Sequence, residues 1–268
     1  MFFDLLKYEF IQRAYLAGSF IAVLCAVLGL LLVLRKLSLI GDGLSHVGFG
    51  AIALGLFLGI YPVYVAIPLV IGASFLVMKL TERAKIYGDA AIGMVSSAGI
   101  AGGVILASLS RGFNVDLFSY LFGSILAISS QEVYLSVGLS LFALFVTVFF
   151  YHDLFASTFD EQYAHVSGVR TGRINLMLMS LTAVTVVLSI KVVGIMLVSA
   201  LLILPAVTAL QAARGFKTAM LMAAAIAVVS VVAGITISFH ADLPAGATII
   251  AVNFLLFLIF FFLKRTIR

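Results

Sequence analysis

The sequence predicts an all-α, polytopic membrane protein in which one domain, residues 1–268, contributes eight or nine transmembrane helices. Two observations support this prediction. First, 64% of the residues are apolar, only 10% are charged and the mean hydropathy is +1.27, whereas about 25% of the residues in a soluble domain are charged. Second, the apolar residues fall in long runs separated by polar breaks, and about 20 apolar residues are enough for a helix to cross a bilayer.

Each long apolar run predicts one helix. Before the first run, residues 1–13 alternate apolar and charged side chains and predict a short interfacial helix. Pro62 interrupts the sequence between two runs and predicts a tight hairpin. Residues 117–129 are too few to cross and predict a partial or re-entrant helix. The spans are expected at residues 14–34, 44–59, 63–78, 90–109, 133–151, 174–190, 192–213, 218–239 and 245–263, which makes nine, or eight if one of the shorter runs is only partial.

Single residues in these runs add local expectations. Gly99 and Gly103 predict a close approach by a neighbouring helix. Lys191 is expected to snorkel at a turn between two spans, and Glu132 is interpreted as a charge at a span boundary. The single cysteine, Cys25, excludes an intrachain disulfide and a cysteine-based zinc cluster.

Basic residues gather at alternate ends of the predicted spans. The positive-inside rule therefore predicts an N-terminus outside the cytoplasm. The formal charge of +5 is explained by this topology, so we expect membrane lipid but no nucleic acid among the partners. The basic positions assigned to the cytoplasm are Arg35, Lys36, residues 79–85, Arg170, Arg173, Arg214, Lys217 and the C-terminal tail.

Asp42 and His46 are ionisable residues between long apolar runs. If residues 38–50 are helical, the i, i+4 spacing places the two side chains on one face with Cβ atoms about 5–6 Å apart. A carboxylate and an imidazole suit Zn²⁺ or Mn²⁺, and two ligands would hold an ion weakly enough to release it. The spacing is equally compatible with a hydrogen-bonded structural pair beside Gly41 and Gly43.

The only long polar segment is residues 152–173. Thr158 and Glu161 have the spacing of a capping box, and Gly168 is suited to end the short helix that follows. Phe155, Phe159 and Tyr163 recur every four residues and predict an aromatic ridge. Such a ridge fits a groove of a cytosolic partner or the headgroup layer of the membrane, and the spacing does not separate the two.

The remaining polar residues indicate no enzyme. The sequence has no Gly-x-x-x-x-Gly-Lys-[Ser/Thr] motif, so energy from ATP must come from another subunit. Ser45 lies in an incomplete Gly-x-Ser-x-Gly pattern without a base, which argues against a hydrolase. His240 and Asp242 precede Pro244 and are better explained as a solvated loop than as a site.

Several motifs occur together and in order: residues 12–14 (QRA), 34–46 (LRKLSLIGDGLSH), 121–126 (LFGSIL), 159–161 (FDE), 193–198 (VGIMLV), 204–206 (LPA) and 243–247 (LPAGA). In combination they resemble the permease subunit of the zinc/manganese ABC importers, the ABC-3 family, over residues 9–263. Gly43 departs from that pattern, in which relatives carry Ala or Thr. The departure leaves Asp42 and His46 in place.

The resemblance implies a helical permease similar to the vitamin B12 importer class, or type II ABC permeases. It implies a homodimer in the prokaryotic plasma membrane, two copies of a cytosolic ATP-binding subunit and an extracellular metal-binding protein. It places metal contacts on Asp42 and His46 and a cytoplasmic coupling helix at about residues 155–169. The residues that this helix would use toward the ATPase are Phe155, Phe159, Asp160, Glu161, Tyr163, Ala164 and Gly168.

Zinc is the expected cargo because imidazole plus carboxylate suits it, while manganese and iron remain open. We expect no permanently bound cofactor, since the ion passes transiently. The alternative is a proton-coupled secondary transporter in which Asp42 and His46 relay protons, because histidine titrates near neutral pH. Dependence on a cytosolic ATPase separates these two classes.

Overall fold

The computed structural model describes residues 8–110, 120–121, 123 and 128–267. Every regular element in these residues is helical. The elements are α2 (Glu9–Leu34), α3 (Ile40–Leu58), α4 (Pro62–Arg83), α5 (Gly88–Leu109), α7 (Ser130–Phe149), α8 (Tyr151–Phe159), α9 (Glu161–Val166), α10 (Thr171–Val193), the 3₁₀ turn η2 (Ile195–Leu197), α11 (Val198–Ala212), α12 (Phe216–Ala241) and α13 (Ala245–Ile267).

Nine helices among the described residues are long and apolar enough to cross a membrane. This confirms the predicted number of spans and the all-α class. The hairpin at Pro62 is also confirmed, because Gly59 ends α3 in the left-handed conformation and Pro62 opens α4. Most of the re-entrant helix expected at residues 117–129 lies outside the described residues.

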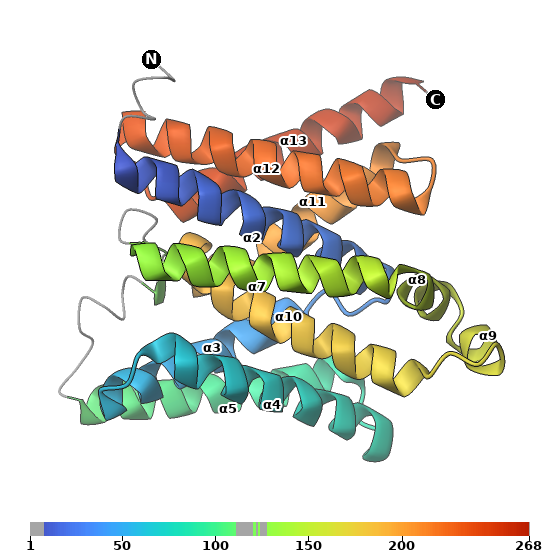
Figure 1. Cartoon of the computed structure of the whole chain (residues 1–268), viewed down its shortest axis with the longest axis horizontal. Coiled ribbons are helices and arrows are strands. Elements are labelled where there is room, and N and C mark those ends of the chain that lie inside the picture. The colour runs from blue at the N-terminus through green and yellow to red at the C-terminus, as the bar shows by residue number, and fades with distance from the viewer. Residues whose placement is uncertain (1–7, 111–119, 122, 124–127, 268) are drawn as a thin grey trace.

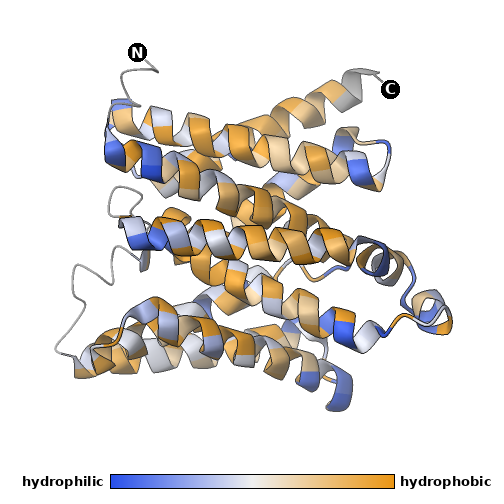
Figure 2. Ribbon diagram, viewed as in Figure 1, coloured by the Kyte–Doolittle hydropathy of each residue, from blue (hydrophilic) through white to orange (hydrophobic). Residues whose placement is uncertain are grey.

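The helices form two groups that α10 joins (Figure 1). α3, α4 and α5 pack together on one side, and α2, α11, α12 and α13 pack together on the other. α10 contacts α2 as well as α3 and α4, and α2 and α10 are the most buried spans. Hydrophobic residues make up most of the body of each helix, while hydrophilic residues gather at the helix ends (Figure 2). Short α8 and α9 project from one end of the bundle.

Glycines allow α3 and α5 to approach closely. A Cβ atom added to Gly99 of α5 would lie 2.6 Å from the Cα atom of Val47, and one added to Gly103 would lie 2.5 Å from the Phe49 ring. Gly50 of α3 faces Gly99 in the same way. Because helix association in lipid depends on close packing of small residues, this contact confirms the role expected of Gly99 and Gly103.

Two local predictions were wrong. Of the interfacial helix expected at residues 1–13, residues 1–7 lie outside the described residues. Residues 9–13 form no separate helix, because α2 runs without a break from Glu9 and its first turn joins Arg13 to Glu9 by an ion pair of 2.9 Å. Lys191 lies at no turn, since α10 continues to Val193. The chain turns at Gly194, whose φ of 89° favours glycine.

Candidate metal site and polar clusters

Asp42 and His46 lie on one helix, as the sequence predicted. Both belong to α3, with Asp42 in the first turn, and His46 Nε2 lies 3.6 Å from Asp42 Oδ2. In the single chain, 28% of the His46 side chain and 46% of the Asp42 side chain are exposed. The N-cap of α3 is Leu39, which makes no side-chain cap hydrogen bond, and Asp42 lies three residues further along in the first turn. Both side chains are therefore accessible to a ligand.

The glycines on either side of Asp42 have close neighbours on two other helices. A Cβ atom on Gly41 would lie 2.5 Å from Leu202 Cδ1 of α11, and one on Gly43 would lie 2.5 Å from Ile92 Cγ2 of α5. Glycine at both positions lets the first turn of α3 fit between these helices. The departure from the family pattern at Gly43 thus coincides with a close contact to α5.

Ser199 is a third polar group at this place, and sequence reasoning missed it. Its hydroxyl donates to Asp42 Oδ1 at 3.4 Å from the first turn of α11, just after the η2 break. The motif at residues 193–198 was visible in the sequence, but nothing there indicated that η2 and α11 pack against α3. Over the described part of the chain, no three His, Cys, Asp or Glu side chains gather closely enough to hold a metal ion.

The polar segment forms two short helices, so its predicted capping box was wrong. Thr158 lies inside α8, where its hydroxyl donates to the Leu154 carbonyl oxygen at 2.6 Å. Asp160 is the N-cap of α9 instead, because its extended backbone ends α8 and its Oδ1 accepts from the Tyr163 amide at 2.8 Å. Gly168, with a φ of 89°, follows α9 and confirms the predicted end of the helix.

The kink at Asp160 shortens the predicted aromatic ridge. Phe155 and Phe159 lie together on α8, with ring centroids 4.8 Å apart, and both also contact the Phe216 ring at the start of α12. Tyr163 belongs to α9 and is exposed. The ridge therefore consists of two phenylalanines, with the tyrosine presented by the next helix.

The other residues expected in this segment divide between surface and interior. Ala164 is fully buried, so it packs α9 onto the bundle and cannot meet a partner directly. The Glu161 side chain accepts a hydrogen bond from Asn175 of α10 at 2.9 Å. Asp160 and Glu161 are both exposed.

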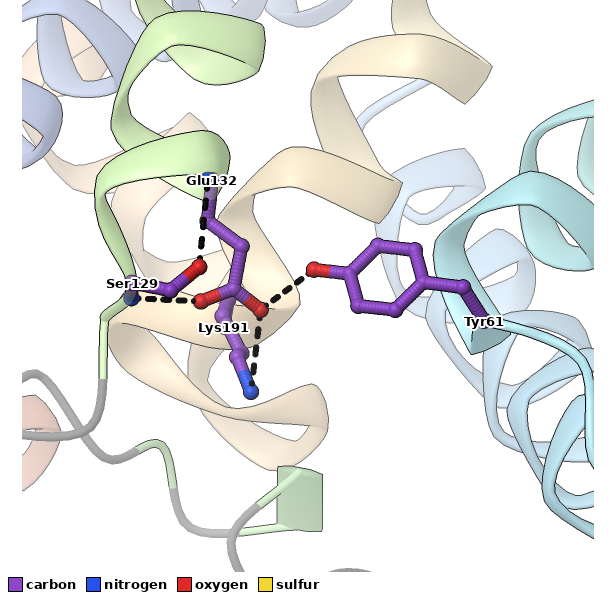
Figure 3. A network of polar contacts seen from close by, with 4 residues as sticks. All are labelled: Tyr61, Ser129, Glu132 and Lys191. Atoms are coloured by element: carbon purple, nitrogen blue, oxygen red, sulfur yellow. Dashed lines mark hydrogen bonds and ion pairs between the residues drawn. The ribbon is translucent and has the colours of Figure 1, made fainter.

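A second polar cluster lies around Glu132 (Figure 3). Glu132 lies in the first turn of α7, at the predicted span boundary, but its side chain is buried. Its Oε1 accepts from the Tyr61 hydroxyl at 2.6 Å and lies 3.2 Å from Lys191 Nζ. Its Oε2 accepts from the Ser129 amide at 2.8 Å in a reciprocal capping box. The Lys191 ammonium also lies 4.5 Å from the centre of the Tyr120 ring.

The Glu132 cluster joins α4, α7 and α10, and it explains why Lys191 sits within a helix. A buried carboxylate needs a partner, and Lys191 supplies one from the last turn of α10. The Ser-x-x-Glu spacing at residues 129–132 is a capping-box signal that the sequence carried. His240 and Asp242, in contrast, are exposed at the end of α12, as expected of solvated residues.

Comparisons with known proteins agree with this architecture. Residues 7–264 match the ABC 3 transport family. The chain is 33% identical to the manganese transport system membrane protein MntC of Halalkalibacterium halodurans, over 97% of this chain and 90% of that protein. It is 30% identical to the high-affinity zinc uptake system membrane protein ZnuB of Haemophilus influenzae, over 96% and 99%.

The fold is similar to that of a solved structure. PsaBC from Streptococcus pneumoniae, solved in complex with a Fab, superposes with a TM-score of 0.88 at 30% identity and covers 97% of this chain and 94% of its own. The family match covers nearly the whole chain, and nine apolar helices lie among the described residues. The chain therefore belongs to the ABC 3 transport family and is a multi-pass bacterial membrane protein of the ABC permease type.

Proposed function

We propose that this chain is the permease subunit of an ATP-driven importer of divalent metal, and that it carries zinc past Asp42 and His46. The observation that supports this best is the pair itself, a carboxylate and an imidazole 3.6 Å apart and open to a ligand. On a tetrahedral zinc ion with bonds of about 2.0–2.1 Å, two ligand atoms lie about 3.3 Å apart. Small side-chain movements bring the pair to that separation.

The pair suits transport because it is incomplete. A structural zinc site has four ligands and holds its ion tightly. Here the proposed ligands are one carboxylate, Asp42, and one imidazole, His46, beside the Ser199 hydroxyl. Water or a second copy of the chain completes the shell, which fits the proposed homodimer. An ion bound this weakly can leave when the helices move, because its affinity differs between the two conformations.

The proposal includes partners for energy and delivery. Two cytosolic ATP-binding subunits would dock on α8 and α9, and an extracellular metal-binding protein would deliver the ion. Relatives named for manganese and for zinc both match the chain, so manganese is the competing cargo. Imidazole ligation favours zinc over manganese.

The test is uptake of radioactive zinc by vesicles that hold the chain with its ATP-binding subunit and binding protein, with manganese as competitor. Asp42→Ala and His46→Ala are expected to abolish uptake and to leave membrane insertion intact, since neither residue lies in the buried core. Asp89→Ala, an exposed aspartate in the first turn of α5, and His240→Ala are the matched controls and should transport normally.

Three outcomes would contradict parts of the proposal. Wild-type uptake in both Asp42→Ala and His46→Ala would refute the site. If manganese competes more strongly than zinc for uptake, manganese replaces zinc as the proposed cargo. Uptake that a proton gradient drives without ATP would favour the secondary transporter.

A further inference from the structure

Arg35 forms a hydrogen-bonded hub at the end of α2. Its Nε donates to Thr158 Oγ1 at 3.0 Å, its Nη1 to Asn175 Oδ1 at 2.5 Å and its Nη2 to Ser157 Oγ at 2.6 Å. Ser157 and Thr158 belong to α8, and Asn175 lies in the second turn of α10. The Asn175 amide in turn donates to Glu161 of α9. One guanidinium therefore ties α2, α8, α9 and α10 together.

The Arg35 guanidinium stays positively charged within these hydrogen bonds. Burial lowers the pKa of the Arg35 guanidinium from its ordinary value, and the negative charge of Glu161 opposes that shift. Arginine stays protonated in proteins, and its planar fork is preorganised for several acceptors at once. A lysine has one rotating ammonium and cannot reproduce the three directed bonds.

A short, hydrogen-bonded turn, residues 35–40, connects the hub to the helix that carries Asp42. Arg35 is the C-cap of α2, and the chain then turns at Lys36, whose φ is 59°. The Leu37 amide donates back to the Leu32 carbonyl oxygen at 2.9 Å, and α3 begins at Ile40. A displacement of Arg35 is therefore passed on to the first turn of α3 instead of being absorbed by a loop.

A cavity beside the hub leaves room for it to rearrange. The cavity has a volume of about 380 Å³ and lies between the α2–α3 turn and α4, α5, α8, α9 and α10. Arg35, Ile40, Glu82 and Glu161 are among its lining residues. Because packed interiors resist movement, this space permits α8 and α9 to shift against the start of α3.

We propose that Arg35 is a positioning residue that couples movement of α8 and α9 to the Asp42–His46 end of α3. This inference rests on the proposed function, in which the ATP-binding subunits dock on α8 and α9. The hub turns a displacement at the docking surface into a change at the metal ligands. Without it, the ATP-binding subunits hydrolyse ATP while the metal site stays in one conformation.

The experiment compares Arg35→Gln with Lys36→Gln in reconstituted vesicles of the whole complex. Lys36 is the adjacent exposed cation, so its variant removes the same charge without touching the hub. Co-purification of the ATP-binding subunit, the rate of ATP hydrolysis and the zinc ions moved per ATP are measured together. Arg35→Gln should keep co-purification and the rate of ATP hydrolysis within about twofold of the wild type and lower the zinc-to-ATP ratio about tenfold. Lys36→Gln should match the wild type in all three. Arg35→Lys should fall between them.

The same measurements give clear contrary outcomes. An Arg35→Gln variant with the same zinc-to-ATP ratio as Lys36→Gln would refute the inference. Loss of the ATP-binding subunit together with transport would show a structural role and also refute it. If Arg35→Gln does not insert, Asn175→Ala carries the test, because it removes one acceptor and should lower the ratio in the same direction. A wild-type complex without ATP-dependent uptake would refute the proposed function itself, and the inference with it.

Discussion

Lys191 Nζ lies 3.2 Å from Glu132 Oε1, so a cation from the last turn of α10 pairs with an anion from the first turn of α7 (Figure 3). The Glu132 side chain is 10% exposed and the Lys191 side chain 21%. Tyr61 adds a hydroxyl from the start of α4 to the same carboxylate oxygen. The ion pair thus joins α10 to α7, and the Tyr61 hydrogen bond ties the start of α4, in the α3–α5 group, to the same carboxylate.

Glu132→Ala is expected to destabilise the chain by about 3 kcal/mol. Removing one partner of a buried ion pair costs about 3–5 kcal/mol, and the partial exposure of Lys191 places the cost at the lower end. The measurement is unfolding by denaturant in mixed micelles. Glu82→Ala, an exposed glutamate on α4, is the control and should change stability little. Equal stability of the two variants would show that the Glu132–Lys191 ion pair does not stabilise the fold.

Tyr61 gives a pH dependence with a definite sign. Burial raises the pKa of Tyr61, and the hydrogen bond to Glu132 and its charge add to the rise. Above about pH 10 the unfolded chain releases the phenolic proton while the folded chain keeps it, so stability falls as the pH rises. Tyr61→Phe should be less stable at pH 8 and should show a shallower decline above pH 10. Parallel curves for the two proteins would contradict this assignment.

Gly99→Ala tests the close contact between α3 and α5. The added Cβ would lie 2.6 Å from Val47 Cα and 2.9 Å from Val47 N, and backbone atoms cannot move aside alone. Overpacking of this kind costs about 1–3 kcal/mol. Gly102→Ala on the same helix is the matched control, because its Cβ meets nothing within 4 Å and alanine favours a helix. Equal melting temperatures for the two variants would mean that α5 is free to shift.

The spans could be predicted because lipid forces each crossing segment to satisfy its backbone hydrogen bonds within a helix. Length and hydropathy therefore decide the number of helices. The ends of helices depend on single interactions instead. Glu9 and Arg13 suggested an interface, yet their i, i+4 pairing is equally suited to the first turn of a long helix. A lysine between two apolar runs predicts a turn at residue 191, but the pairing of Lys191 with Glu132 keeps it inside α10, and the chain turns three residues later at Gly194.

The candidate site was predictable only where its geometry is local. Asp42 and His46 are one helical turn apart, so their proximity follows from secondary structure alone. Ser199 lies 157 positions from Asp42. Tyr61 and Lys191, which pair with Glu132, come from two other parts of the chain. Hydrophobic periodicity reports which face of a helix is buried, but it does not report which distant helix covers that face. These contacts therefore required the structure.

Phe159→Ala is expected to weaken binding of the ATP-binding subunit about tenfold, because exposed aromatic anchors often dominate such interfaces. The Phe159 ring is 59% exposed at the end of α8, where it rests against Phe155 and Phe216. Phe145→Ala on α7 removes a similarly exposed ring from a membrane span and should leave binding unchanged. Binding is measured by titrating the labelled ATP-binding subunit onto each variant in nanodiscs. If both variants bind like the wild type, α8 is not the docking surface, and the headgroup layer becomes the better explanation for its aromatic residues.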